Sequence, residues 1–263
     1  MTVWDAIILG IVQGLTEFLP ISSSGHLVLC QHILGVKTPG VSLEIWLHLG
    51  TFVAVIGYFY KKIIVLTKSL LPGNVESETT YNRKTILAII IGTIPAVVVG
   101  LGLKSYIESV FSSPVFASSM LLVTAAILFA SAFAKNKKLP LTLPKGLVIG
   151  LSQAVAILPG ISRSGSTITC AMLLGMKPSE AAEFSFLLAI PAVGGAFLLD
   201  LISHGRTFFT GDEIMLYLIG TAASFIFGLL SIHYLLKIIK KGSFYLFGFY
   251  CLAAGIISLV YIV

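Results

Sequence analysis

The sequence predicts an all-α polytopic membrane protein built as an inverted repeat of two units, each a re-entrant helix hairpin followed by three transmembrane helices. Three observations lead to this fold class. Of the 263 residues, 57% are hydrophobic and 11% are charged, and the mean hydropathy is +1.01, which is far more apolar than a soluble domain. Several uncharged stretches approach the roughly 20 residues that a helix needs to cross a bilayer. A polar motif near the N-terminus also occurs twice. We expect six crossings and about ten helices in a single membrane domain, residues 1–263.

The duplicated motif defines the two units. Shifting the numbering by 140 aligns ten identical residues without a gap, including Ser-x-Ser-Gly at 22–25 and 162–165 and Leu-Gly-x-Lys at 34–37 and 174–177. A match of this extent indicates an internal repeat. We therefore predict a first inverted repeat over residues 1–134 and a second over residues 145–263.

The N-terminal segment predicts the first hairpin. Residues 3–19 are helical by composition, and Pro20 followed by Ser-Ser-Ser-Gly ends that helix. The next apolar segment, residues 26–36, would cover only about 16 Å as a helix, roughly half a bilayer. Two helices joined by a polar loop, one of them half-length, are typical of a re-entrant hairpin whose tip is buried in protein or lines a wet cavity.

The remaining elements repeat this plan. A second hairpin is predicted over residues 146–158 and 166–176. The six predicted crossings are residues 42–60, 85–103, 115–134, 184–203, 214–236 and 244–262.

The loops predict the topology. Lys and Arg gather in the connections 61–84, 135–145 and 237–241, whereas 104–114 and 204–213 are weakly basic. The positive-inside rule places the basic connections in the cytoplasm. Both termini then lie outside and the hairpins enter from opposite faces, an arrangement that puts a shared site near the middle of the membrane.

Charge and cysteine content exclude other classes. The net charge of +6 comes from basic residues in short loops, which is a topology signal and does not indicate nucleic-acid binding. The first ten residues contain Asp5 but no Lys or Arg, and no small-residue cleavage site follows, so we expect no cleaved signal peptide. Cys30, Cys170 and Cys251 have neither a close pair nor a metal spacing, and we interpret them as packing residues.

Carboxylates inside apolar sequence are the first candidates for chemistry. Gln13 and Glu17 are four residues apart and share a helix face. Because intramembrane carboxylates usually mark sites or pathways, we favour a functional role for Glu17 over simple pairing with loop N–H groups. Glu44 and Glu183 lie near predicted helix starts, where a structural role is favoured. His48 follows Glu44 by one turn on the same face.

The two tips supply the remaining groups. Pro-Ile-Ser-Ser-Ser-Gly places hydroxyls and N–H groups before a helix N-terminus, where an anion binds well. His26 follows directly and could act as base, acid or nucleophile. Arg163 needs an anion and suits phosphate, although an ion pair with Glu17 would also satisfy it. This combination indicates phosphoryl transfer or hydrolysis. No Walker-type loop, His-Glu-x-x-His or Gly-x-Ser-x-Gly pattern is present, so other hydrolase classes lack support.

Two long motifs carry a family resemblance. Residues 13–26 and Pro159-Gly-Ile-Ser-Arg-Ser-Gly-Ser-Thr167 strongly resemble the undecaprenyl-diphosphate phosphatase family linked to bacitracin resistance, and the likeness extends along the whole chain, including 183–191. The resemblance implies hydrolysis of undecaprenyl diphosphate to undecaprenyl phosphate and inorganic phosphate, which recycles the lipid carrier for cell-wall synthesis. It also implies a divalent cation, Mg²⁺ or Ca²⁺. It further implies a multi-pass protein of the bacterial plasma membrane with an active site open to the outer face.

The resemblance also assigns roles to residues. Glu17, Ser23, His26 and Arg163 resemble the catalytic residues, with Glu17 also implied as a metal ligand. The implied substrate-binding residues are Gln13, Ser22, Ser24, Gly25, Ser162, Ser164, Gly165 and Thr167. Gln13 stands where many members have a second Glu, so an amide must orient water or phosphate there, and Ser24 replaces a common Thr. Whether Ser23 or His26 is the nucleophile is left open.

Two other functions compete with this interpretation. A lipid or anion transporter or flippase would also use inverted repeats with broken helices, and a channel with a Ser-lined constriction is a further alternative. The expected partners are undecaprenyl diphosphate and the lipid bilayer, with no nucleic acid. Gly10 with Gly14 and Gly146 with Gly150 form small-xxx-small pairs, which we expect to pack hairpin against bundle rather than two monomers together, while a homodimer stays open.

Overall fold

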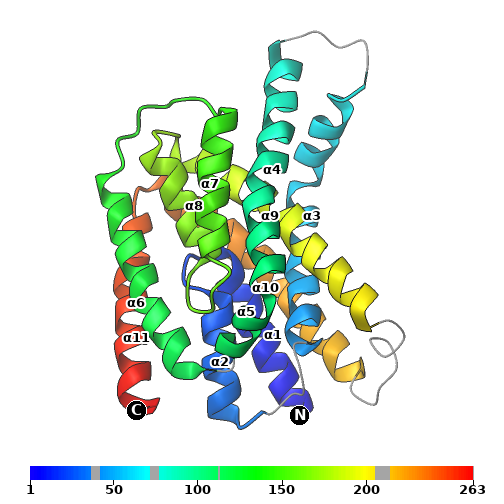
Figure 1. Cartoon of the computed structure of the whole chain (residues 1–263), viewed down its shortest axis with the longest axis vertical. Coiled ribbons are helices and arrows are strands. Elements are labelled where there is room, and N and C mark those ends of the chain that lie inside the picture. Colours follow the sequence, from blue (N-terminus) through cyan, green and yellow to red (C-terminus); the bar gives the residue numbers. More distant parts are fainter. Residues whose placement is uncertain (37–41, 72–76, 112, 205–213, 263) are drawn as a thin grey trace.

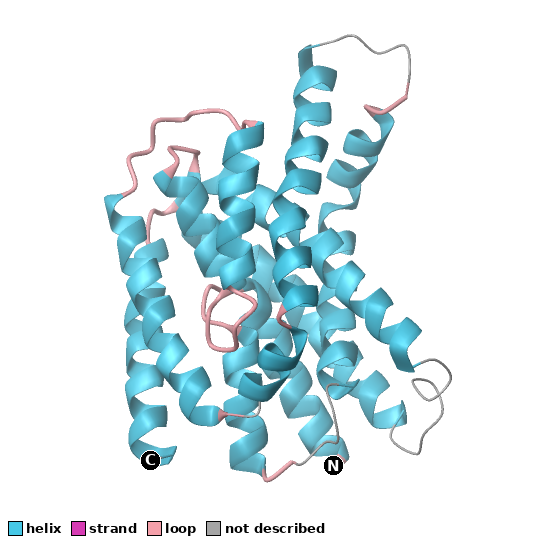
Figure 2. Ribbon diagram, viewed as in Figure 1, coloured by secondary structure: helices cyan, strands magenta, loops and turns pink. Residues whose placement is uncertain are grey.

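The computed structural model describes residues 1–36, 42–71, 77–111, 113–204 and 214–262. Within this part the chain forms eleven α-helices and no strand (Figures 1 and 2). Six of these helices are long and apolar enough to cross a membrane. They are α3 (Ser42–Lys68), α4 (Ser77–Gly102), α6 (Pro114–Ala130), α9 (Pro178–His204), α10 (Ile214–Lys240) and α11 (Phe247–Ile262). The all-α fold class and the six crossings are confirmed.

The first hairpin consists of α1 (Val3–Phe18) and α2 (Ser23–Leu34). A capping box begins α1, since Thr2 and Asp5 exchange hydrogen bonds of 2.6 and 3.2 Å, and the bond from the Thr2 N–H holds the pKa of Asp5 below its ordinary value. The prediction that the second helix begins at residue 26 is wrong. Ser22 caps α2 by accepting the Gly25 N–H, so the serines form the first helical turn.

The second hairpin consists of α7 (Leu143–Val155) and α8 (Arg163–Leu173). Here too the helices begin three residues before the predicted 146 and 166. Thr142 caps α7 and Ser162 caps α8 through the Gly165 N–H, which places Arg163 at the first position of α8. A side-chain cap thus explains the early start of both helices.

Several further boundaries differ from the sequence prediction, among them the start of α4, which lies at Ser77 rather than 85. Helix α3 continues past residue 60 to Lys68, because residues 61–68 contain no Gly or Pro. Helix α9 begins at Pro178 rather than 184, since proline fits the first turn of a helix. The predicted loop 104–114 contains helix α5 (Lys104–Phe111). Its Ile107 and Phe111 are four residues apart, and both line the cavity described below.

Each hairpin packs against the second crossing helix of the other half. Helix α1 contacts α10 extensively, and α7 contacts α4 in the same way. Small residues allow this approach: a Cβ on Gly14 would lie 2.8 Å from the Phe227 Cβ, and one on Gly150 would lie 2.5 Å from the Gly92 Cα. The expected packing of small-xxx-small pairs between hairpin and bundle is confirmed.

The two tips meet inside the bundle. In Figure 1, α1 and α2 rise from the lower end, α7 and α8 descend from the upper end, and their connecting loops lie near the middle. The Ser164 hydroxyl donates to the Leu19 carbonyl at 3.2 Å, which joins one tip to the other. Thr124 of α6 holds the second tip through Gly160 and Ser162, at 2.7 and 3.0 Å.

The ends of the molecule are consistent with the predicted topology. Figure 1 places the end of α3, the start of α4 and the α6–α7 connection at the upper end and both termini at the lower end. The assignment of residues 1–134 and 145–263 as inverted repeats, and of the termini to the outside, stays a prediction.

Candidate active site

The two tips border one cavity of about 340 Å³. Helices α3, α5 and α9 complete its walls. Its polar lining consists of Glu17, Ser22, Ser23, Ser24, Glu44, His48, Gln153, Ser162 and Arg163, and its apolar lining includes Ile45, Ile107, Phe111, Ile157, Val193 and Phe197. A cavity with a polar floor and apolar walls suits a ligand that has a charged head and an apolar body.

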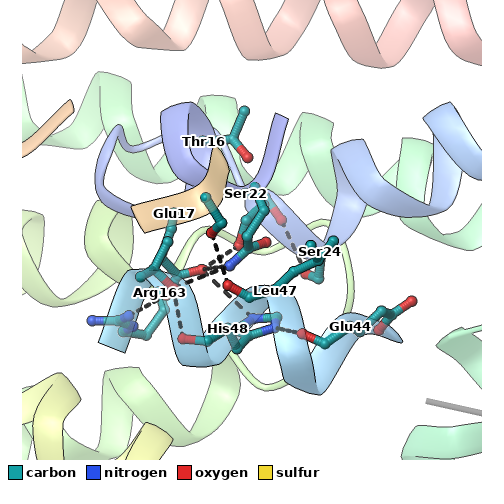
Figure 3. A network of polar contacts seen from close by, with 12 residues as sticks. Thr16, Glu17, Ser22, Ser24, Glu44, Leu47, His48 and Arg163 are labelled. Atoms are coloured by element: carbon teal, nitrogen blue, oxygen red, sulfur yellow. Dashed lines mark hydrogen bonds and ion pairs between the residues drawn. The ribbon is translucent and has the colours of Figure 1, made fainter. Parts of the chain in front are cut away.

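Glu17 is the centre of the polar floor (Figure 3). Arg163 Nη2 forms an ion pair with Oε1, and Ser23 Oγ donates to Oε2 at 2.5 Å. Gln13 Nε2 donates to the same Oε2 at 3.1 Å, and His48 Nε2 lies 3.6 Å from it. Glu17 is the penultimate residue of α1, where the helix dipole disfavours a negative charge. Its carboxylate therefore depends on these partners from α2, α3 and α8.

Each tip contains the same capping hydrogen bond from a glycine N–H to a serine hydroxyl. Ser22 Oγ accepts the Gly25 N–H at 3.3 Å, and Ser162 Oγ accepts the Gly165 N–H at 3.0 Å. Ser22 has φ 69 and ψ 97, a conformation that is costly for a residue with a side chain and that is typical of functional sites. Ser23, which follows it, is presented to the cavity at the first position of α2.

Two polar groups of the cavity have no partner among the described residues. Arg163 Nη1 is buried and makes no hydrogen bond, although Nη2 of the same guanidinium pairs with Glu17. Gln153 is 2% exposed, and neither its Oε1 nor its Nε2 has a partner. Buried polar groups are rarely left unpaired, so these atoms are candidates for contact with a ligand.

His48 and Glu44 of α3 also face the cavity. His48 Nδ1 lies 2.7 Å from the Glu44 carbonyl oxygen. Because that oxygen can only accept, Nδ1 carries the proton and Nε2 is turned to Glu17. Sequence reasoning noted this Glu and His pair but did not include it in the site. The sequence does contain a signal for them, because two polar residues one turn apart are unusual in an apolar crossing helix.

His26 lies apart from this cavity. Its Nδ1 is 2.8 Å from the Ser22 carbonyl oxygen and its Nε2 is 2.8 Å from the Tyr250 hydroxyl of α11. It lines a second cavity of about 740 Å³ with residues of α1, α10 and α11. The sequence prediction puts His26 beside Ser23 in a shared cavity, but the structure places its ring against Tyr250 in the second cavity. Its catalytic role stays a prediction.

The remaining predicted residues support the cavity without lining it. Gln13 bonds Glu17, and Ser164 bonds the Leu19 carbonyl. Thr167 Oγ1 lies 2.6 Å from Ser185 Oγ, which joins the N-terminal half of α8 to α9. Gly25 and Gly165 donate their N–H groups to the capping serines, and a Cβ on Gly25 would lie 3.0 Å from the Gly160 Cα. Gln13, Gly25, Ser164, Gly165 and Thr167 thus position the groups that face the cavity.

The donor set can be tested against a hard divalent cation. Among the described residues, no three His, Cys, Asp or Glu side chains cluster closely enough to hold a metal by themselves. The cavity does contain the carboxylates of Glu17 and Glu44 and the unpaired amide oxygen of Gln153. Mg²⁺ is usually held by one or two carboxylates together with substrate phosphates and water. These oxygen donors fit an ion that binds together with a phosphorylated ligand.

Comparisons with known proteins agree with this chemistry. The family model described as "Bacitracin resistance protein BacA" matches residues 6–257. A protein of Korarchaeum cryptofilum named undecaprenyl-diphosphatase is 44% identical over 97% of this chain and 98% of its own length. Proteins of the same name from Desulforapulum autotrophicum and Geotalea daltonii are 42% and 40% identical, over 99% and 100% of this chain and 98% and 99% of their own lengths.

Proposed function

Because the chain belongs to the bacitracin resistance protein BacA family, we propose that it is a multi-pass membrane phosphatase that hydrolyses undecaprenyl diphosphate to undecaprenyl phosphate and inorganic phosphate. One observation carries the proposal. A serine hydroxyl, a carboxylate and an arginine from two hairpins are hydrogen-bonded together at the floor of one cavity. Phosphoryl transfer requires a nucleophile, an acceptor for its proton and a cation for the phosphate, and these are the three groups present.

Ser23 is the nucleophile in this proposal. Its Oγ lies 2.5 Å from Glu17 Oε2, so the carboxylate can take the hydroxyl proton as Oγ attacks the terminal phosphorus. The bond between that phosphorus and the bridging oxygen breaks, and the carrier monophosphate leaves. Water then attacks the phosphoserine, its phosphorus–Oγ bond breaks, inorganic phosphate leaves and a proton returns to Oγ. His26, with both ring nitrogens engaged elsewhere, is not placed to make this attack.

Arg163 and the helix start that carries it stabilise the phosphate charge. Nη2 holds Glu17 in place, and Nη1 remains as a donor for a phosphate oxygen. The N-terminus of α8 also favours an anion. Glu17 and Glu44 would hold a Mg²⁺ or Ca²⁺ ion shared with the substrate. Such an ion, when bound, neutralises charge on the diphosphate oxygens.

The apolar wall suits the first isoprenoid units of the lipid. Ile107 and Phe111 of α5 and Val193 and Phe197 of α9 line the same cavity as the polar groups. A prenyl chain lying against this wall would keep its diphosphate at Ser23. We place the protein in the bacterial plasma membrane with both termini and the cavity toward the outer face, as its loop charges and its family suggest.

The test is phosphate release by the purified full-length chain in detergent. With no compartments left, an enzyme still liberates inorganic phosphate from undecaprenyl diphosphate in the presence of Mg²⁺, whereas a transporter or flippase does not. The three relatives above are named as phosphatases, and the transporter alternative is not favoured. Absence of phosphate release by well-folded wild-type protein would refute the proposal.

A further inference from the structure

Gln153 of α7 has no structural task in the cavity that it lines. It is 2% exposed, and both of its amide atoms lack a partner among the described residues. An unpaired buried amide reduces stability, so such a group is retained where it binds something else.

Its repeat equivalent shows what a structural glutamine does in this fold. Gln13, 140 positions earlier, donates from Nε2 to Glu17 at 3.1 Å and lies 3.4 Å from the Thr51 hydroxyl. The residue that corresponds to Glu17 in the second half is Ile157. Gln153 therefore has no carboxylate to orient, and its amide remains free for a ligand.

A second unpaired donor lines the same cavity. Arg163 Nη1 is buried without a partner, like Gln153 Nε2. Both are N–H donors, and a phosphate group offers only acceptors at its free oxygens. We propose that Gln153 is a substrate-binding residue whose Nε2 donates to a phosphate oxygen of the diphosphate that Arg163 also holds. This inference rests on the proposed function and adds a residue to its binding site.

The experiment uses methylenediphosphonate, a diphosphate analogue that cannot be hydrolysed, as a competitive inhibitor of phosphate release by the full-length protein in detergent. Gln153→Met keeps the approximate shape and removes the donor. We expect its inhibition constant to rise about tenfold, which corresponds to about 1.4 kcal/mol. Gln153→Glu presents a carboxylate to the phosphate and should weaken inhibition further.

The matched control is Ser152→Ala, one position away. The Ser152 hydroxyl bonds the Ile149 carbonyl of its own helix. The inhibition constant of this control should stay within twofold of wild type.

The melting temperature of the ligand-free protein separates binding from a structural role. Replacing an unpaired amide by a thioether relieves a buried polar group, so Gln153→Met should melt at or above the wild-type temperature. Gln13→Met breaks bonds that exist and should melt lower. An unchanged inhibition constant in Gln153→Met, or a loss of melting temperature equal to that of Gln13→Met, would overturn the inference.

Failure of the proposed function gives a different pattern. If wild-type protein releases no phosphate, binding of methylenediphosphonate is still read from the rise in melting temperature that it causes. A rise in wild type that is lost in Gln153→Met and retained in Ser152→Ala supports the phosphate contact even then. A rise of the same size in wild type and Gln153→Met refutes it.

Discussion

The two hairpin tips have the same capping hydrogen bonds and different chemistry. In each, the capping serine accepts the N–H of the glycine three residues on, and its hydroxyl lies 3.4 or 3.3 Å from that of the second serine, Ser24 or Ser164. The position after the cap holds Ser23 in one tip and Arg163 in the other. Glu17 likewise corresponds to Ile157. The duplicated scaffold therefore supplies one nucleophile and one phosphate-binding cation at equivalent places, and the active site requires both.

Of the substitutions considered, removal of the Ser23 hydroxyl should reduce the activity most. Because Ser23→Ala leaves Glu17 and Arg163 without a nucleophile, we expect kcat for undecaprenyl diphosphate hydrolysis to fall by about 10³-fold or more. The melting temperature should fall much less than kcat, because only the hydrogen bond from Ser23 to Glu17 is lost and Glu17 keeps its bonds to Gln13 and Arg163. Steady-state phosphate release measures the effect. Activity within tenfold of wild type would show that a group other than Ser23 attacks the phosphorus.

Making the second tip resemble the first should also damage the site. Ile157→Glu places a second carboxylate on the cavity wall, where it competes for Arg163 and repels the diphosphate. We expect kcat/KM to fall by about 10-fold to 100-fold, the size of an interaction of one to three kcal/mol. Ile157→Gln, similar in shape and uncharged, is the control. Equal kinetics for the two variants would show that charge at this position is irrelevant.

The helix packing that brings the tips together can be tested at Gly150. A Cβ on Gly150 would lie only 2.5 Å from the Gly92 Cα. Relieving this clash requires the two helix backbones to move apart, which costs packing free energy. We expect Gly150→Ala to reduce the free energy of unfolding by about 1–3 kcal/mol. Gly100→Ala is the matched control, because the nearest atom to its new Cβ is 3.9 Å away. Thermal or denaturant unfolding in detergent should show loss only in the first variant.

The smallest expected difference concerns the two capping serines. Ser22 has φ 69 whereas Ser162 has φ −73, so glycine relieves strain at the first position only. We expect Ser162→Gly to destabilise the protein by up to about 1 kcal/mol more than Ser22→Gly, although both lose the same capping bond. Unfolding of the two variants under one condition compares them directly. Equal losses would mean that the Ser22 conformation is not strained.

The sequence predicts the fold well because composition and repetition determine it. Uncharged stretches of membrane-spanning length give the six crossings, and the Pro20 and Ser-Gly segments give the hairpins. Helix α5 is missed because a short segment of eight residues with interspersed polar side chains between two crossings resembles a loop. Both hairpin caps are missed because a serine before a helix and a serine in its first turn look alike until the Gly25 and Gly165 hydrogen bonds are known.

The candidate site is predicted only in part. Glu17 and Arg163 stand out as charged residues in apolar surroundings, whereas the family resemblance singles out Ser23 among three serines, and the structure brings these residues together. His48 and Gln153 are absent from the predicted set, since which face of a crossing helix meets a distant hairpin depends on tertiary packing. His26 shows the opposite case. Its ring is oriented by Tyr250, which is 224 residues away, and no local pattern contains that partner.

The central claim is that Glu17 of the first tip and Arg163 of the second act as one unit. The most direct measurement is a double-mutant cycle with Glu17→Ala, Arg163→Ala and the double variant, assayed by phosphate release from undecaprenyl diphosphate in detergent. Each single substitution should lower kcat/KM by at least about 10²-fold, and the double variant should be little worse than either, because groups that act together are not additive. Near-normal phosphate release by either single variant, or two losses that multiply in the double variant, would contradict the account.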